Sequence, residues 1–113
     1  MPSPHPRAGM TLGRGVVLPD GPVPDARDFA VRCESLGYDA CWVGELWGRD
    51  AFVTLTAVAG AVDDLTLGTA IVNVFSRSPA TLAAAASSLA AVAPAGVRLG
   101  VGPSTPTAVE GLH

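Results

Sequence analysis

Polar side chains follow three short apolar runs of this chain, each at the point where the run ends. They are Glu45 after the first run, Asn73 after the second and Ser104 after the third. A carboxylate, an amide and a hydroxyl can orient an organic ligand by hydrogen bonds, and a carboxylate can also move protons. If the three runs are parallel strands of a barrel, their carboxyl ends lie at one rim, where such barrels carry their chemistry. The pattern therefore predicts a ligand-binding rim.

The elements that would position these groups alternate between strands and helices. Apolar runs closed by Gly, Pro or Asp predict four strands, at residues 15–18, 40–44, 65–72 and 97–101. Apolar positions at three- and four-residue spacing predict three helices, at residues 25–36, 50–62 and 80–93. Strands alternating with helices of this length indicate an α/β protein with a parallel sheet and right-handed crossovers. Residues 105–106 predict the start of a further helix.

Each predicted helix begins at a residue that can accept hydrogen bonds from its first turn. We expect Asp25, Asp50 and Ser78 to be the N-caps, with Pro79 as the first residue of the third helix. Gly37 is the expected C-terminal stop of the first helix. The core face of that helix is predicted to carry Phe29, Ala30, Cys33 and Leu36.

The composition favours one core-rich domain without a nucleic-acid or membrane partner. The 113 residues carry a net charge of −3 and are 49% hydrophobic. All seven basic residues are Arg and they are scattered, so no cluster follows a phosphate backbone. No apolar run approaches the ~20 residues of a membrane span. We expect a disordered leader over residues 1–13, without the apolar stretch of a signal peptide, and a domain over 14–113 in the cytoplasm.

The two cysteines, Cys33 and Cys41, are predicted to be buried free thiols rather than a disulfide. As metal ligands they lack partners, because the two histidines stand at opposite ends of the chain. We therefore expect no metal site.

Three segments of the chain carry a family resemblance. Residues 37–45 read Gly-Tyr-Asp-x-x-Trp-Val-Gly-Glu, residues 47–52 read Trp-Gly-Arg-Asp-Ala-Phe, and residues 67–79 read Leu-Gly-Thr-x-Ile-Val-Asn-Val-Phe-Ser-Arg-Ser-Pro. Together they resemble the luciferase-like monooxygenase superfamily, and most closely its deazaflavin-dependent oxidoreductases. The resemblance covers about residues 15–113. Because an eight-stranded barrel needs ~250 residues, it implies the N-terminal (βα)4 half of a TIM barrel, truncated after the fourth strand.

The resemblance also implies a cofactor and the residues that hold it. The cofactor would be a deazaflavin (coenzyme F420), or alternatively FMN, lying across the carboxyl rim of the barrel. A bulge at residues 70–73 would support its central ring, with a non-prolyl cis peptide bond between Ala70 and Ile71. The implied cofactor-binding residues are Glu45, Ala70, Ile71, Val72, Asn73, Gly102 and Ser104.

The chain departs from the family pattern at the end of its second strand. Members of the family usually have an acidic residue followed by His there, whereas this chain has Glu45 followed by Leu46. Leucine neither donates a hydrogen bond nor accepts a proton. Acid-base chemistry is therefore not assigned to residue 46, and no residue is assigned as catalytic.

Several polar or aromatic residues near the predicted rim have two interpretations. Glu45 is either a site carboxylate, which we favour, or an ordinary acid at a strand end. Trp47 either lines the cofactor pocket or packs under its own loop. Asn73, Ser76 and Arg77 either contact a ligand or are polar because loops face water, and for Arg77 we favour a solvated charge.

Two functions follow from these observations. The first is an oxidoreductase that binds a deazaflavin or FMN and acts on a small organic substrate, whose identity the sequence does not give. The second is a non-catalytic half-barrel, which either self-associates through its open sheet edges as a homodimer or interaction module, or is a degenerate fragment of a longer barrel.

Overall fold

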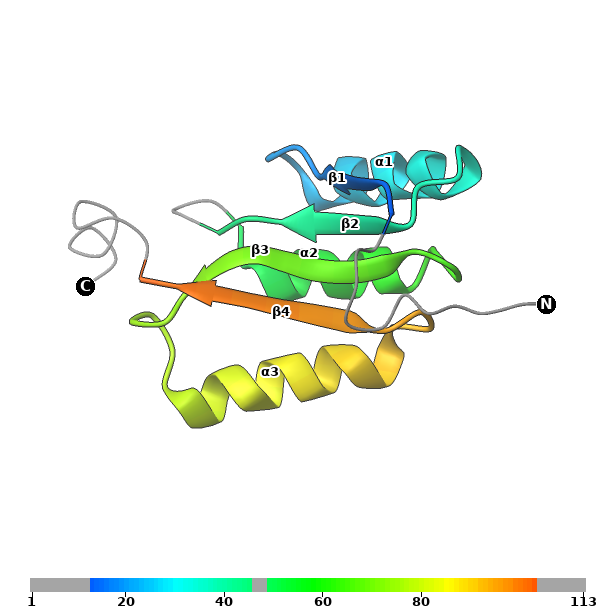
Figure 1. Cartoon of the computed structure of the whole chain (residues 1–113). Helices are drawn as coiled ribbons and strands as arrows, with labels where there is room; N and C mark the ends of the chain where they lie inside the picture. Colours follow the sequence, from blue (N-terminus) through cyan, green and yellow to red (C-terminus); the bar gives the residue numbers. More distant parts are fainter. Residues whose placement is uncertain (1–12, 46–48, 104–113) are drawn as a thin grey trace.

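Four parallel strands form the sheet of this protein. The structure, a computed structural model, describes residues 13–45 and 49–103. The strands are β1 (Gly15–Val17), β2 (Ala40–Val43), β3 (Thr66–Asn73) and β4 (Val97–Gly102), and they lie side by side in chain order (Figure 1). The predicted α/β half-barrel order of strands is confirmed.

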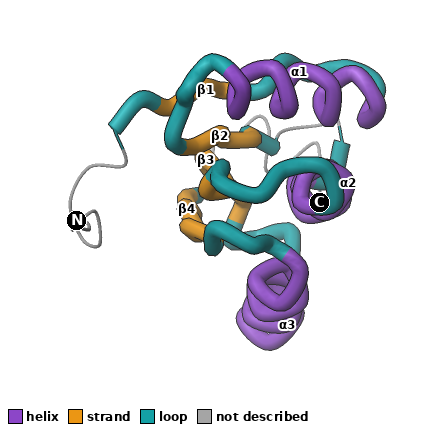
Figure 2. Tube along the Cα trace, turned by 90° about the vertical axis from the view of Figure 1, so that its right-hand side faces the viewer, coloured by secondary structure: helices purple, strands orange, loops and turns teal. Residues whose placement is uncertain are grey.

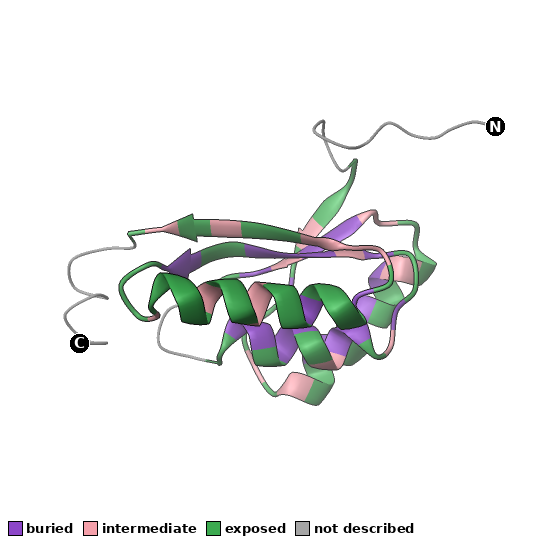
Figure 3. Cartoon of the chain, turned by 90° about the horizontal axis from the view of Figure 1, so that it is seen from below, coloured by how far each residue is buried: buried purple, intermediate pink, exposed green. Residues whose placement is uncertain are grey.

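The three helices all cover the same face of the sheet. They are α1 (Val23–Ser35), α2 (Ala51–Ala59) and α3 (Pro79–Val92), and Figure 2 shows them on one side of the strands. The core lies between the helices and the sheet, where the buried residues gather (Figure 3). Its largest fully buried side chains include Leu55, Leu65, Leu67 and Leu89. In the part of the chain that the structure describes, no helix covers the opposite face, and Val17 and Ile71 are exposed.

The predicted starts of α2 and α3 are confirmed. The carboxylate of Asp50 accepts hydrogen bonds from the backbone nitrogens of Phe52 and Val53, at 2.9 and 3.2 Å. Ser78 Oγ accepts one from the backbone nitrogen of Thr81 at 3.1 Å. Each cap satisfies donors that the first helical turn leaves unpaired. α2 ends at Ala59, three residues earlier than predicted.

The start of α1 and part of its core face were predicted wrongly. The helix begins at Val23 after Pro22, so Asp25 lies in its first turn and is not the cap. Pro24 presets the helical backbone, and the carbonyl oxygen of Pro22 accepts the first turn's bonds. The buried face consists of the small residues Ala26, Ala30 and Cys33, which allow close approach to the sheet. The bulkier Phe29 and Leu36 are exposed, because Phe29 lies beside this face and Leu36 follows the last turn.

Both cysteines are buried and unbonded to each other, as predicted. Burial, with a smaller contribution from nearby Cys33, raises the pKa of the Cys41 thiol to about 12. This thiol is therefore protonated at neutral pH and unreactive.

The strand β3 contains a bulge opposite Gly100. Thr69 pairs with Leu99 and Val72 with Val101, so two residues of β3 face one residue of β4. Thr69 Oγ1 donates to the carbonyl oxygen of Gly100 and accepts from its backbone nitrogen, both at 2.8 Å. The bulge is where the sequence predicted it.

The expected cis bond between Ala70 and Ile71 is wrong, since the described residues contain no cis peptide bond. A bulge needs one extra residue in the strand and no cis bond, and the two Thr69 bonds satisfy the backbone nitrogen and oxygen of Gly100 opposite it.

Gly100→Ala should destabilise the protein because its new Cβ would meet backbone atoms of the bulge. The Cβ position lies 2.5 Å from the oxygen of Thr69 and 2.7 Å from that of Ala70. We expect a loss of roughly 1–3 kcal/mol, measured by urea unfolding. Gly44→Ala is the matched control, because nothing lies within 4 Å of its Cβ position. Equal stability of the two variants would contradict this account of the bulge.

Candidate functional site

The carboxyl ends of β2, β3 and β4 meet at one rim of the sheet. The backbone nitrogen of Glu45 donates to the carbonyl oxygen of Ile71 at 3.2 Å. The backbone nitrogen of Val74 donates to the carbonyl oxygen of Gly102 at 3.0 Å. The three segments that the sequence predicted at one rim are therefore neighbours there.

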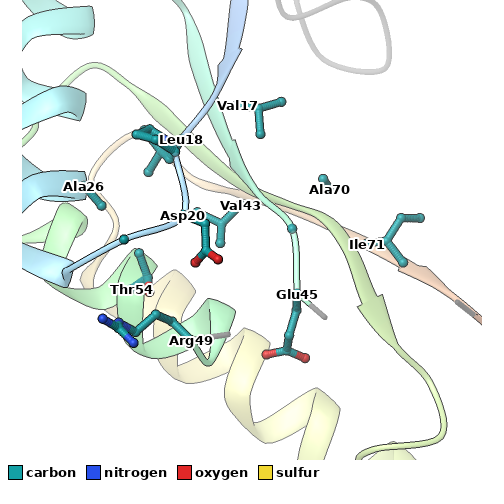
Figure 4. Close-up of a pocket in the computed structure, with 13 residues that line it drawn as sticks. Val17, Leu18, Asp20, Ala26, Val43, Glu45, Arg49, Thr54, Ala70 and Ile71 are labelled. Atoms are coloured by element: carbon teal, nitrogen blue, oxygen red, sulfur yellow. The ribbon is translucent and has the colours of Figure 1, made fainter. Parts of the chain in front are cut away.

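An open cavity of about 900 Å³ lies at this rim, beside the loop that follows β1 (Figure 4). Three of the predicted site residues, Glu45, Ala70 and Ile71, border it. The remaining lining comes from the end of β1 and its loop, from the end of β2, from α1, and from α2 and the residues before it. These residues are Val17, Leu18, Pro19, Asp20, Gly21, Ala26, Val43, Gly44, Arg49 and Thr54. The wall is therefore mainly apolar, which is typical of sites for organic ligands.

The other predicted site residues do not border the cavity. Val72 is fully buried and belongs to the core on the helix side of the sheet. Asn73 is also buried, and its Oδ1 accepts from the backbone nitrogen of Phe75 at 2.6 Å. Its Nδ2 has no hydrogen-bond partner in the described part of the chain. Gly102 lies against the side chain of Ile71. Ser104, like Leu46 and Trp47, lies outside the described residues.

Both carboxylate oxygens of Glu45 are engaged in hydrogen bonds. Arg77 Nη1 donates to Oε1 at 2.6 Å, and Arg77 Nη2 donates to Oε2 at 2.7 Å. The backbone nitrogen of Ala51, in the first turn of α2, donates to Oε2 at 2.8 Å. The side chains of Arg77 and Glu45 are 12% and 11% exposed. Glu45 is thus a fixed part of the wall, since donors hold both of its carboxylate oxygens.

Arg77 connects this pair to the N-terminus of α2. Its Nη2 also donates to Asp50 Oδ2 at 2.8 Å, and its guanidinium lies 5.0 Å from the centre of the Phe52 ring. The hydrogen bonds to Glu45, above all, raise the pKa of Arg77 beyond its usual range, although burial opposes the shift. At Asp50, burial favours the neutral form, but bonds from Arg77 and from α2 outweigh it and lower the pKa. We call Arg77, Glu45 and Asp50 the rim clamp.

The interpretation of Arg77 as a solvated charge is therefore wrong. The guanidinium is enclosed because two carboxylates from other segments meet it, which satisfies donors that would otherwise need water. One signal in the sequence was available: Glu45 and Arg77 each follow one of two consecutive strands that the alternating pattern places side by side.

Two charged side chains stand at the border of the cavity outside the clamp. Asp20, in the loop after β1, and Arg49, before α2, are exposed, and neither makes an ion pair with another described residue. Residues 13–45 and 49–103 contain no group of three or more His, Cys, Asp or Glu that could hold a metal ion. None of the helices in these ranges has the length and apolar character needed to cross a membrane.

A family model places this chain among known proteins. The model for luciferase-like monooxygenases matches residues 4–113. The chain belongs to this family. The resemblance found in the sequence, and the fold it implied, are therefore confirmed.

Two curated relatives of this luciferase-like chain are named for deazaflavin or pterin chemistry. A Mycobacterium tuberculosis protein named for coenzyme F420-dependent oxidoreductase activity is 30% identical over 107 residues. A 5,10-methylenetetrahydromethanopterin reductase of Methanolobus tindarius is 33% identical over 95 residues. The matches cover 94% and 83% of this chain but only 31% and 29% of these relatives. The chain thus spans about three tenths of their length.

Solved structures show the same fold. The coenzyme F420-dependent tetrahydromethanopterin reductase of Methanopyrus kandleri superposes with a TM-score of 0.82 at 20% identity, over 89% of this chain and 30% of that one. The oxygenating constituent of 3,6-diketocamphane monooxygenase from Pseudomonas putida, in complex with FMN, gives 0.73 at 19% identity, over 89% and 32%. At these identities the likeness shows the fold alone, and it supports the half-barrel arrangement of the luciferase-like chain.

Arg77→Ala should destabilise the protein because it leaves Glu45 enclosed without its counter-charge. Breaking a buried pair from one side costs 3–5 kcal/mol, and since this pair keeps some solvent contact we expect about 3 kcal/mol in urea unfolding. Arg27→Ala is the control, because the Arg27 and Asp28 side chains are 50% and 74% exposed and such pairs contribute little. A loss no greater than that of the control would show that the rim clamp is not a stabilising contact.

Proposed function

We propose that this chain forms the cofactor-binding rim of an oxidoreductase that uses a deazaflavin (coenzyme F420), with FMN as the alternative. The single observation that carries the proposal is the apolar cavity at the carboxyl ends of the strands, bordered by the bulge residues Ala70 and Ile71. Membership of the luciferase-like family supports the class of chemistry. The reaction would be hydride transfer to or from a small organic substrate.

The residues at the rim fit a flat ring system. The cavity, at about 900 Å³, lies within the ~300–1,000 Å³ common for small-molecule sites. Ala70 and Ile71 are both exposed and form an apolar ledge, on which the ring would rest. Asn73, buried at the end of β3, would hold the strand end beside the ledge through the hydrogen bond that its Oδ1 accepts from the backbone nitrogen of Phe75. When bound, the ring would supply the group that accepts or donates hydride.

The remaining predicted residues would support this ledge rather than react. Val72 holds the bulge from the core side, and Gly102 lies against Ile71, where a Cβ would come within 3.2 Å of that side chain. We assign Ser104 as a further hydrogen-bonding residue of the rim. Glu45, held by Arg77, would fix the wall beside the reacting part of the ligand.

The names of the relatives favour the deazaflavin over FMN. Three of the similar proteins are named for coenzyme F420 or for reduction of a tetrahydromethanopterin, and one structure contains FMN. The absence of basic clusters in the sequence disfavours a nucleic-acid substrate. A small organic molecule remains the proposed substrate.

Titration of the 113-residue chain with coenzyme F420 and with FMN tests this function. We expect saturable quenching of cofactor fluorescence, tighter for coenzyme F420. Ala70→Leu adds side-chain volume to the ledge on which the ring would rest. The larger side chain should crowd the cofactor and weaken its binding roughly 10-fold, a loss of about 1.4 kcal/mol in binding free energy. Ala91→Leu, at an exposed position of α3, is the control and should bind as the parent does. Lack of saturation with both cofactors would exclude the proposed function for this chain.

Self-association is the second candidate, because both edges of the sheet are open. Within residues 13–45 and 49–103, β1 pairs only with β2, and β4 only with β3. Leu99 and Val101 on the β4 edge are exposed, as are Val17 and Ile71 on the other strands. Open apolar edges favour pairing with another chain. We propose a homodimer in which β4 of one copy lies beside β1 of the other.

Light scattering would measure this association through the mass of the particle. A dimer would have twice the monomer mass of 11.4 kDa. Val101→Lys places a charge on the β4 edge and should return the protein to the monomer. Val92→Lys, on an exposed position of α3, is the matched control and should leave the dimer intact. A parent protein that stays monomeric at every concentration would rule the dimer out.

The cytoplasm is the compartment we propose for this function. Two buried cysteines that form no disulfide are consistent with a reducing compartment. Recovery of the native protein from an exported fraction would contradict this assignment.

A further inference from the structure

The indole ring of Trp42 lies across the face of the sheet that the described helices leave uncovered (Figure 2). A Cβ at Gly68 would collide with the ring at its Cε3 and Cζ3 atoms, and one at Gly15 would come within 2.8 Å of its Nε1 atom. Gly15 belongs to β1 and Gly68 to β3, so the ring of this β2 residue extends over both neighbouring strands. Trp42 is partly exposed. The open face therefore carries an aromatic surface.

Arg98 stands on the same face, on the edge strand β4. It pairs with Gly68, and Gly68 pairs with Trp42, so the three residues form one row across the sheet. Residues paired in this way share a face, and Val97, which precedes Arg98, packs against the core on the other face. Arg98 is exposed, and it makes no ion pair with another described residue.

The cation and the aromatic ring of this row do not meet within one copy of the chain. Elsewhere in the described residues, Arg14 lies 5.0 Å from the centre of the Tyr38 ring and Arg77 lies 5.0 Å from that of Phe52. Arg98 makes no such contact, because the strand β3 separates it from Trp42. A guanidinium group is attracted to the face of an aromatic ring, and most strongly to tryptophan. The open face thus presents two complementary groups that are each unpartnered.

We infer that the open face binds a second copy of this chain, with Arg98 of each copy lying against the Trp42 ring of the other. This inference rests on the self-association proposed above, in which β4 of one copy lies beside β1 of the other. Because the Trp42 ring extends over Gly15 of β1, it lies next to the strand edge that β4 of the other copy would join. A two-fold axis makes the same contact twice. The two copies supply eight strands, the number that closes a TIM barrel.

The contact would lie at the end of the sheet opposite the candidate site. Gly15 is the first residue of β1 and Arg98 the second residue of β4, whereas the cavity borders the carboxyl ends of the strands. At this end the guanidinium group keeps access to water while the methylene groups of its side chain cover the ring. The pair therefore needs no carboxylate, and the dimer leaves the rim open for a cofactor.

Sedimentation equilibrium of the 113-residue chain measures the dissociation constant of the dimer. Arg98→Ala removes both contacts at once and should raise this constant roughly 30-fold. Arg98→Lys retains a cation and should recover most of the affinity. Arg27→Ala is the matched control, because it removes the same charge from an exposed position of α1, and it should dissociate as the parent does.

A mixture of two variants tests whether the contact joins two copies. Trp42→Leu should weaken the dimer as Arg98→Ala does. In a mixed dimer, Arg98 of the Trp42→Leu copy meets the intact Trp42 of the Arg98→Ala copy. One of the two contacts is then restored, so the mixture should associate roughly 5-fold more tightly than either variant alone. A role of either residue within its own copy would not produce this recovery.

The inference is overturned if Arg98→Ala dimerises like the parent, or if the mixture associates no more tightly than the separate variants. Either result with a dimeric parent removes this contact and leaves the self-association proposal standing. A parent that stays monomeric at every concentration removes both. Because Arg98 is exposed, its Ala and Lys variants decide the question even if Trp42→Leu proves too unstable to measure.

Discussion

The enclosed ion pair between Arg77 and Glu45 is the contact on which the rim depends. It joins the end of β2 to the loop between β3 and α3, and Asp50 and Ala51 attach both partners to the start of α2. Taking two charges out of water is costly, and the attraction compensates only when the remaining donors and acceptors are also satisfied. Here the α2 backbone and the second carboxylate satisfy them. Because the enclosed charges are stable only when all of these bonds are made, the end of β2, the loop before α3 and the start of α2 are held in one arrangement.

The parallel sheet makes this contact attainable. Parallel neighbours end at the same rim, so a carboxylate after β2 and a guanidinium after β3 come within reach although 32 positions separate them. α2 returns its N-terminus to that rim, where unpaired backbone nitrogens favour an acidic partner. One consequence is chemical: the carboxylate that the sequence singled out for the site is bound by Arg77 and forms part of the wall, and the described charged groups left unpaired at the border of the cavity are Asp20 and Arg49.

Residues close together in the sequence predicted most helices and strands well. Contacts between residues far apart in the sequence were not predicted. Asp50 and Ser78 could be predicted as caps because capping uses backbone atoms two or three residues away. The start of α1 was missed because two prolines can begin a helix as effectively as a polar side chain. The burial of Arg77 and the unpaired state of the buried Thr54 hydroxyl depend on residues brought together by the fold. Thr54 and Thr56 are the same residue type two positions apart. Nothing in their local sequence shows that the Thr56 hydroxyl is bonded within α2 whereas that of Thr54 has no partner among the described residues.

The bulge in β3 shows how one extra residue creates the ledge of the candidate site. Side chains of a strand alternate between faces, so consecutive residues normally cannot both leave the core. In β3, Thr69 and Val72 are fully buried while Ala70 and Ile71 between them are both exposed. The pairing of β3 with β4 shifts between Thr69 and Val72. The alternation of side chains between the two faces is therefore interrupted at Ala70 and Ile71 and continues after them. Two adjacent apolar residues thus face the cavity, and Gly100 opposite them leaves the space that the shifted backbone occupies.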